Sequence, residues 1–288
     1  MTAARATRRG ALRATVAGLI RRGNRTVMLT PSPGPRFGNY LYYWLHAHIR
    51  QECGDDLRVQ AQNVVAPWLA QLPALAGLSV PTGGVRPWDR RVWPATNHHQ
   101  AFGSDFSATQ LDRFIRHRLL DSPLLARADQ PSAGTVVVNV RRGDYYSVPK
   151  FAQLFAFDIA AYLAIAVERV RARGPIERIH VVSDDPRWCR EALDTQLRAV
   201  AAHVDYRGCQ SPEEDFATIA GATRLIGTNS TFSYWGGYTA TARFPQAHIV
   251  MPRFHARSVP DGRAYQLDPS WDVVEELPGG WGMPPGIG

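Results

Sequence analysis

The stretch Val136-Val137-Val138-Asn139-Val140-Arg141-Arg142-Gly143-Asp144 indicates both a fold and a site. Its β-branched run, interrupted only by Asn139, is typical of a strand buried on both faces of a parallel sheet. Charged residues follow at once, where the strand ends. Ligands bind beyond the carboxyl ends of the strands in open α/β sheets. We therefore expect an α/β domain whose functional site begins at Asn139.

The chain after this stretch alternates between strand and helix patterns. Ile159, Leu163 and Val167 recur at helical spacing, and a further helix is expected from about Pro186, where proline is tolerated in the first turn. We expect a helix over 216–222 and further strands over 179–182, 224–227 and 249–251. This alternation predicts a doubly wound parallel sheet.

A second α/β domain is expected ahead of the first stretch. Residues 26–30 read as a strand, residues 31–39 as a Pro- and Gly-containing loop, and residues 40–51 as an aromatic helix. The Ala-, Pro- and Gly-rich segment 126–134 has the composition of a linker. We therefore predict one domain over 26–130, a second over 135–277, and a disordered Gly/Pro-rich tail over 278–288.

Composition excludes several classes of protein. Hydrophobic residues make up 45% of the chain and charged residues 20%, as in a globular protein. No apolar run is expected to reach the ~20 residues of a membrane helix. Three widely spaced cysteines fit a reducing cytoplasm. No P-loop motif exists, and no dinucleotide-binding glycine motif follows a strand.

The net charge of +8 comes from arginine, because Lys150 is the only lysine. Nine arginines precede the first acidic residue, Glu52. Compositional bias explains this excess better than nucleic-acid binding. Residues 1–25 have an amphipathic pattern, so they are either a helix that rests on an anionic membrane or a disordered leader. The predicted location is cytoplasmic, with peripheral contact to the membrane.

Three polar clusters each follow an expected strand. They are Asn139 to Asp144, then Ser183-Asp184-Asp185, and then Asn229-Ser230-Thr231-Phe232-Ser233. An arginine can offer a planar fork to a diphosphate. A Ser/Thr-rich helix start offers hydroxyls and backbone N–H groups to the same anion. An aspartate can accept from the N–H edge of guanine or from a ribose diol.

Each cluster also has a structural interpretation. One of Arg141 and Arg142 can be a structural partner of Asp144. The pair Asp184-Asp185 can form a helix N-cap or bind a metal. His98 and His99 are adjacent, not four residues apart, so they do not match a helical metal motif.

The three clusters together resemble glycosyltransferase family 11, the α-1,2-fucosyltransferases. Residues 141–145, Arg-Arg-Gly-Asp-Tyr, resemble the family's H-x-R-R-G-D-Y motif. Residues 183–189 and 229–237 resemble its S-D-D-x-x-W-C and N-S-S-F-S-W-W-G motifs. Gly38-Asn39 matches the end of a G-x-G-N signature. The order and spacing agree from about residue 26 to 275.

The resemblance implies a GT-B enzyme, with two Rossmann-like domains whose parallel sheets face across a cleft. Such an enzyme moves fucose from GDP-fucose to a galactose-type hydroxyl, inverts the anomeric centre and uses no metal. The implied catalytic residues are Asn39, Arg141 and Asp144. The implied donor-binding residues are Gly38, Asn139, Arg141, Arg142, Ser183, Asp184, Asp185, Asn229, Ser230, Thr231, Phe232 and Ser233.

Two departures from the family pattern affect the acceptor side. Asn139 stands where the family has histidine, and residues 35–40 read Pro-Arg-Phe-Gly-Asn-Tyr where the family usually has G-G-L-G-N-Q. The acceptor, a surface glycan or its lipid-linked precursor in a bacterial setting, is not specified, and the general base is not identifiable beyond Asp144. The alternatives are another fucosyl linkage, a metal-dependent sugar transferase that uses Asp184 and Asp185, and a GDP-sugar-binding protein without activity.

Overall fold

The computed structural model describes residues 25–31, 35–128, 132–207 and 211–283. Its contacts divide the chain into two compact units, unit 1 (Met1–His99) and unit 2 (Gln100–Gly288). Both units are mixed α/β structures built on parallel sheets, as the sequence predicted. The predicted leader over 1–25 lies outside the described residues, apart from Arg25.

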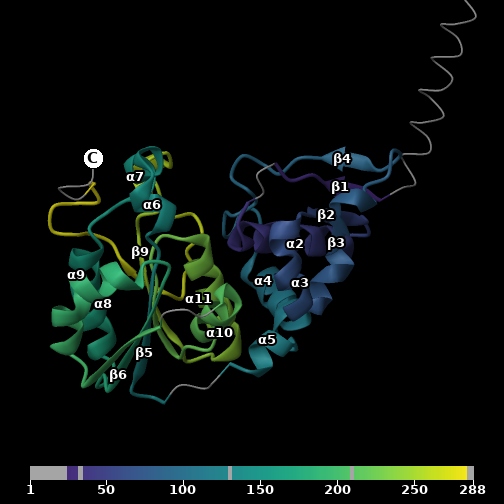
Figure 1. The fold of residues 1–288 in the computed structure, drawn as a ribbon. Coiled ribbons are helices and arrows are strands. Elements are labelled where there is room, and N and C mark those ends of the chain that lie inside the picture. Colours follow the sequence, from purple (N-terminus) through teal and green to yellow (C-terminus); the bar gives the residue numbers. More distant parts are fainter. Residues whose placement is uncertain (1–24, 32–34, 129–131, 208–210, 284–288) are drawn as a thin grey trace, which may run out of the picture. The chain divides into compact units, whose positions relative to one another are not determined.

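Unit 1 contains a four-stranded parallel sheet in the order β3-β2-β1-β4 (Figure 1). Its strands are β1 (Thr26–Met28), β2 (Leu57–Ala61), β3 (Ser79–Pro81) and β4 (Arg90–Val92). Its helices are α2 (Phe37–Glu52), η1 (Asn63–Val65), α3 (Ala66–Gln71), η2 (Pro73–Leu78) and η3 (Thr82–Gly84). The aromatic side chains of α2 form the core of this unit, because Tyr40, Tyr43 and Trp44 are fully buried.

Unit 2 contains a six-stranded parallel sheet in the order β10-β9-β8-β5-β6-β7. Its strands are β5 (Thr135–Val140), β6 (Arg178–Ser183), β7 (His203–Arg207), β8 (Arg224–Ile226), β9 (His248–Pro252) and β10 (Asp272–Val274). The first strand of this sheet in the sequence, β5, lies in its middle. The strands β6 and β7 follow on one side of β5, and β8, β9 and β10 follow on the other side. The strand order therefore reverses between β5 and β8, which is where ligands bind in sheets of this kind.

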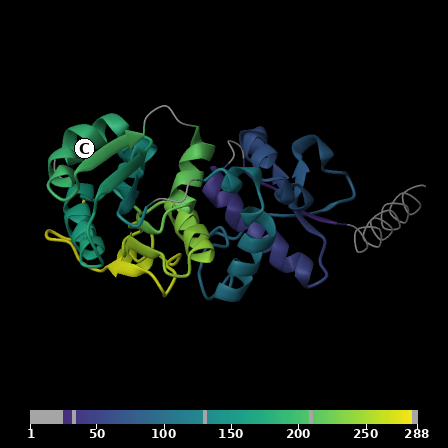
Figure 2. The same cartoon turned by 90° about the horizontal axis from the view of Figure 1, so that it is seen from below.

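Helices cover both faces of the unit 2 sheet (Figures 1 and 2). One face carries α8 (Ile159–Arg171) and α9 (Pro186–Arg198), and the other carries α10 (Pro212–Ala220) and α11 (Thr231–Arg243). The remaining helices are α4 (Ala108–Ile115), η4 (Arg116–Leu120), α5 (Pro123–Ala126), α6 (Gly143–Ser147), α7 (Pro149–Phe155) and η5 (Pro260–Gly262). Every residue of β5 is buried, which confirms the prediction from its β-branched run.

The boundary between the units differs from the predicted one. The sequence placed it in the linker 126–134, whereas the contacts divide the chain after His99. The reason is the packing of α4 and α5 on unit 2. The rings of Phe114 and Trp235 meet at 5.7 Å, and Arg116 donates to the Ala242 carbonyl at 3.2 Å. Linker composition did not reveal these contacts.

Part of the predicted C-terminal tail lies within the described residues. We predicted disorder over 278–288, but residues up to Met283 are described. The Trp281 ring stacks on Phe254 with a centroid separation of 5.8 Å, and its indole N–H donates to the Glu275 carbonyl. Arg257 also donates to the Trp281 carbonyl at 2.8 Å, so ring stacking and hydrogen bonds together hold this segment against the core. Residues 284–288 lie outside the described part.

One stretch, Pro149–Arg171, has the length and mean hydropathy of a membrane span, contrary to the sequence-based expectation. It comprises α7 and α8, which are separated by an extended turn at Ala156. The apolar side of α8 packs into the unit 2 core through Tyr162, Leu163 and Val167. This packing accounts for its hydrophobicity as that of a core helix.

Candidate functional site

The loop after β5 begins beside the loop after β8, at the point where the strand order reverses. The Arg141 backbone N–H donates to the Thr228 hydroxyl at 3.0 Å, which joins the two loops. This bond places Arg141 directly at the carboxyl edge of the sheet. Thr228 was not among the predicted site residues, although its position just after a strand is a usable signal.

The Arg141 guanidinium lies between two carboxylates. One nitrogen, Nη2, donates to Asp144 Oδ1 at 2.6 Å, and Nη1 pairs with Asp184 Oδ2 at 2.7 Å. Burial lowers the pKa of Arg141, but the charges of Asp184 and Asp144 outweigh this effect and raise it. The side chain is 28% exposed, so a fixed cation remains accessible at the strand edge.

Arg142 has a different, structural environment. Its guanidinium carbon lies 3.9 Å from the Trp188 ring centroid and 4.3 Å from that of Tyr146. Its Nε donates to Asp185 Oδ2 at 3.1 Å, and its side chain is only 13% exposed. Two aromatic faces and one carboxylate therefore hold Arg142 in place. Of the two arginines, Arg141 is the one available to a ligand.

The two adjacent aspartates after β6, Asp184 and Asp185, make different contacts. Asp185 is the N-cap of α9, since its Oδ1 accepts from the Trp188 backbone N–H at 3.1 Å. Asp184 instead accepts from the Arg142 backbone N–H at 2.8 Å with Oδ1 and pairs with Arg141 through Oδ2. The N-cap interpretation is confirmed for Asp185. Asp184 connects the β5 and β6 loops. The Ser183 hydroxyl stabilises the β6 loop by accepting from the Asp185 backbone N–H at 3.0 Å.

Gly143 is required by the close approach of these two loops. Its φ is +24°, and a Cβ added there would lie 2.3 Å from Asp184 Oδ2. Only glycine has neither the Cβ nor a strong preference against this backbone conformation. The glycine of the Arg-Arg-Gly-Asp motif therefore makes room for the carboxylate that holds Arg141.

The polar residues at the start of α11 form a buried chain of hydrogen bonds. Ser233 donates its hydroxyl to Asn139 Oδ1 at 2.6 Å, and the Ser230 and Ser233 hydroxyl oxygens are 2.8 Å apart. Ser230 also caps α11 by accepting from the Ser233 backbone N–H. Both serines are buried, so their hydroxyls serve the sheet–helix junction. Their contact with a diphosphate stays a prediction.

The amides of Asn139 and Asn229 have structural partners. Asn139 donates to the Val182 carbonyl at 3.1 Å, which links β5 to β6 on the buried side. Asn229 donates to the Phe155 carbonyl at 2.9 Å and to the His255 carbonyl at 2.8 Å. Thr231 and Phe232, in the first turn of α11, are partly exposed and are therefore the residues of this cluster that can face a ligand.

Three aromatic residues that were not among the predicted site residues, Tyr145, Phe155 and His255, lie near the loop junction. Tyr145 stacks on Phe155 with ring centroids 4.3 Å apart, and the Arg141 guanidinium lies 5.6 Å from the Tyr145 centroid. Burial lowers the pKa of the His255 imidazole to about 4. His255 is therefore neutral near pH 7. It lies outside the motifs, and its place beside Asn229 depends on the path of the chain after β9.

The predicted site residues of unit 1 lie in the first turn of α2. Gly38 is buried, and Asn39 is partly exposed and donates its backbone N–H to the Arg36 carbonyl at 3.0 Å. Phe37, at the start of the helix, stacks on Trp68. The predicted helix start at residue 40 is therefore three residues late. A catalytic role for Asn39 stays a prediction.

Within the described residues, no group of three or more His, Cys, Asp or Glu side chains is arranged to hold a metal ion. The acidic residues of the site are instead bonded to arginines. The arrangement as a whole therefore presents one accessible guanidinium, held by two carboxylates, beside a capped helix N-terminus. Such a site is suited to an anion that bears more than one negative charge.

Comparison with known proteins finds related sequences for this part of the chain. The sequence model of glycosyl transferase family 11 matches residues 104–244. Galactoside alpha-(1,2)-fucosyltransferase 1 of Ateles belzebuth is 32% identical over 145 residues, which are 50% of this chain and 39% of that protein. The Bos taurus protein of the same name is 35% identical over 137 residues, covering 48% of this chain and 38% of its own.

Galactoside alpha-(1,2)-fucosyltransferase 2 of Mus musculus is 39% identical over 119 residues, 41% of this chain and 33% of that protein. The chain thus matches less than half the length of each of these relatives. A solved structure of POFUT1 in complex with GDP aligns with 80% of this chain and 75% of its own, at 14% identity and a TM-score of 0.30.

The family match contains the three loops that meet at the carboxyl edge of the unit 2 sheet. The loops after β5, β6 and β8, with Arg141, Asp184 and Ser230, all lie within residues 104–244. Residues 104–244 of this chain therefore match glycosyl transferase family 11, and this match is the likeness on which a function can be proposed.

Proposed function

We propose that this chain is an inverting, metal-independent fucosyltransferase. It moves L-fucose from GDP-fucose to a hydroxyl, O2 of a galactose-type residue, on a surface glycan or its lipid-linked precursor. The observation that carries the proposal is the meeting of three motifs at the point where the unit 2 strand order reverses: Asp184 pairs with Arg141, and Ser233 donates to Asn139. The match of residues 104–244 to the family supports the donor class.

Arg141 is suited to the charge that develops in this reaction. Departure of GDP from fucose builds negative charge on the diphosphate, and a fixed cation lowers the barrier if it is in place beforehand. Asp144 and Asp184 hold the guanidinium in one orientation through two of its N–H groups. The Nε–H and the remaining Nη hydrogens have no partner among the described residues, so they can meet phosphate oxygens.

The contacts of the acidic pair support a reaction without a metal. Asp184 and Asp185 are each bonded to an arginine, and Asp185 also caps α9. A divalent cation at these carboxylates would have to displace both arginines. Their remaining lone pairs stay available to the guanosine of the donor, which is the role that the family pattern implies.

Asp144 is the candidate for accepting the proton of the acceptor hydroxyl. Its Oδ1 is bonded to Arg141, whereas its Oδ2 has no partner among the described residues. The side chain is 33% exposed. Asp144 would act together with acceptor contacts from outside this loop. Asn39 is the proposed acceptor-side residue.

Calorimetric titration tests the donor first. The full chain is titrated with GDP, GDP-fucose, GDP-mannose and UDP-galactose, each with and without EDTA. We expect binding of the GDP compounds only, unchanged by EDTA. Preference for the UDP sugar, or loss of binding in EDTA, would contradict the proposal. Incubation with GDP-fucose and a β-galactoside should then give an α-1,2 linkage by NMR; binding without any turnover would indicate a GDP-sugar-binding protein.

A further inference from the structure

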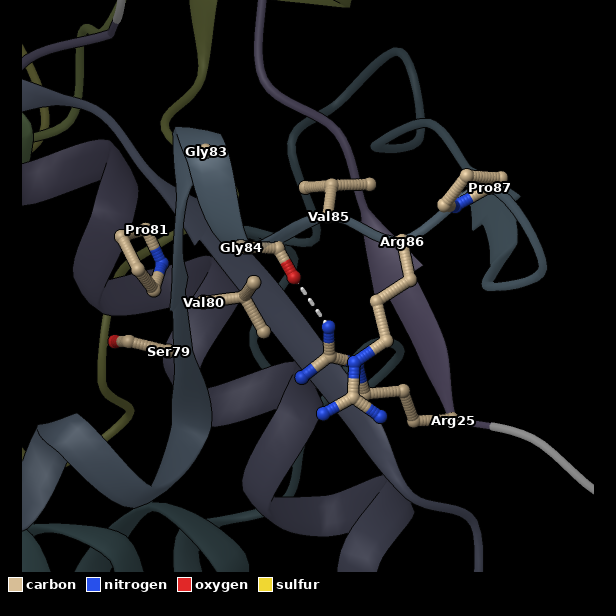
Figure 3. Close-up of a pocket in the computed structure, with 9 residues that line it drawn as sticks. All are labelled: Arg25, Ser79, Val80, Pro81, Gly83, Gly84, Val85, Arg86 and Pro87. Atoms are coloured by element: carbon tan, nitrogen blue, oxygen red, sulfur yellow. Dashed lines mark hydrogen bonds between the residues drawn. The ribbon is translucent and has the colours of Figure 1, made fainter.

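Unit 1 contains a cavity of about 480 Å³ that the donor site does not use. It is lined by Arg25, residues 79–81 and residues 83–87, between β3 and the start of β4 (Figure 3). The lining combines two arginines with small and apolar residues. All of these residues belong to unit 1, whereas the three donor motifs belong to unit 2.

Arg25 is fixed at the wall of the cavity by a buried carboxylate. Its Nε and Nη2 donate to the two oxygens of Asp89 at 3.1 and 2.9 Å, and Nη2 also donates to the Gly84 carbonyl (Figure 3). The Asp89 side chain is only 1% exposed. The third guanidinium nitrogen, Nη1, has no partner among the described residues and remains able to donate to a ligand.

Arg86 places a second guanidinium at the same cavity. Its backbone N–H donates to Asp89 Oδ2 at 2.7 Å, whereas its side chain has no acceptor among the described residues. Figure 3 shows this side chain turned toward that of Arg25. The Arg25 guanidinium is therefore paired with the buried Asp89, whereas the Arg86 guanidinium has no carboxylate partner among the described residues. The cavity carries a surplus positive charge and unused N–H donors, which is the chemistry that recognises a phosphate.

The surface next to the cavity has the composition of a membrane-binding face. Arg90 and Arg91, in the edge strand β4, are exposed. The indole of Trp88, before the strand, is 47% exposed, and that of Trp93, directly after it, is 64% exposed. Tryptophan is enriched where one end of a side chain meets apolar tails and the other meets water. Arginines near an anionic leaflet add electrostatic attraction.

We propose that the Arg25–Arg86 cavity binds the phosphate of an anionic lipid headgroup, and that the β4 edge docks on the membrane leaflet that carries it. The exposed tryptophans favour a lipid over a soluble phosphate. A soluble phosphate would not contact the apolar rings on either side of the arginine-bearing strand, whereas a lipid leaflet would. The proposal is independent of the donor and of the reaction.

Vesicle binding by the full chain tests this proposal. Flotation is measured with vesicles of phosphatidylcholine alone and of phosphatidylcholine mixed with phosphatidylglycerol. We expect binding to the mixed vesicles only. Arg86→Gln should weaken it at least about fivefold, the effect of losing one basic contact at an anionic surface. The double variant Trp88→Ser/Trp93→Ser should weaken binding but retain its dependence on salt.

Two matched variants control for charge. Arg187→Gln removes the same charge from an 86% exposed side chain on α9, and it should leave vesicle binding unchanged. Arg9→Gln removes one positive charge from the N-terminal segment. If this variant lost as much vesicle binding as Arg86→Gln, the assignment to the cavity would be overturned. Unchanged flotation of Arg86→Gln would overturn it as well. The proposal would also be overturned if the chain bound neither kind of vesicle but bound inorganic phosphate in calorimetry, and if Arg86→Gln abolished that phosphate binding.

Discussion

At the scale of single residues, Arg141 is the group on which the proposed chemistry depends most. Removing one preorganised donor to developing charge typically costs ~100-fold or more in rate. We expect Arg141→Ala to lower kcat by at least that factor, and Arg141→Lys to recover only part of it, because lysine cannot bond two carboxylates and a diphosphate in a planar fork. Initial rates of fucose transfer measure this, with circular dichroism as a check of folding. An Arg141→Ala enzyme with the wild-type kcat would refute the assignment.

Gly143 makes a separate residue-scale prediction about the loop. A methyl group there would collide with Asp184 and strain a backbone at φ +24°. We expect Gly143→Ala to displace Asp184, free Arg141 and weaken GDP binding, as measured by calorimetry. Gly103→Ala is the matched control, since Gly103 also has a positive φ of 84° but no atom within 4 Å of the added Cβ. Equal losses of GDP affinity in both variants would mean that strain alone is responsible.

The burial of His255 predicts how the free energy of unfolding depends on pH. Its folded-state pKa of about 4 lies below the ordinary value of 6.5, because burial disfavours the charged ring. The unfolded chain therefore binds a proton at higher pH than the folded chain does. The free energy of unfolding should fall by up to about 3 kcal/mol from this group as the pH drops from about 6.5 to about 4.

Urea unfolding across that pH range measures the effect. His255→Gln should flatten the slope, whereas His203→Gln, at an exposed position in β7, should leave it as in the wild type. A His255→Gln chain that keeps the wild-type slope would show that other groups cause the acid sensitivity.

At the scale of elements, the N-terminus of α11 couples stability to the site. Ser230 caps the helix and takes part in the buried chain with Ser233 and Asn139. We expect Ser230→Ala to lower the free energy of unfolding by about 1 kcal/mol and also to weaken donor binding. Ser211→Ala removes a comparable cap from α10, at an exposed position. It should lower stability similarly but leave GDP affinity unchanged; a matching loss of affinity would show that the coupling is not specific to α11.

The elements also show what the sequence could and could not predict. The strands β5, β6, β8 and β9 were predicted from their runs of β-branched and other apolar residues, and β5, β8 and β9 are buried along their whole length. The edge strands β7 and β10 were missed, since His203–Arg207 and Asp272–Val274 carry charged residues. The motifs identified Arg141 and Asp184. The distinction between Arg141 and Arg142, and the burial of Ser230 and Ser233, depend on hydrogen bonds between distant segments, which no local pattern encodes.

At the scale of the whole molecule, the division after His99 predicts that residues 100–126 are needed for unit 2 to fold. The composition of the linker 126–134 would not predict this. Residues 100–126 belong to unit 2 through several contacts. The buried side chains of Gln100 and Gln266 are joined by a hydrogen bond of 2.8 Å, and the Phe102 N–H donates to the Tyr265 carbonyl at 2.9 Å. The fully buried ring of Phe114 lies against Trp235, which is also fully buried. Removing this segment would expose a large apolar area on α11, the helix that begins at the site.

We therefore expect a fragment of residues 100–288 to unfold cooperatively in urea and to bind GDP, because it retains all three donor motifs and the packing of α4. A fragment of residues 135–288 retains the same motifs but lacks α4 and α5. Loss of a buried aromatic contact typically costs 3–5 kcal/mol, a large part of the stability of a domain. The shorter fragment should aggregate or unfold without a cooperative transition. If it instead folded and bound GDP as tightly as the longer one, the segment from Gln100 would be dispensable, and the domain boundary would lie in the linker after all.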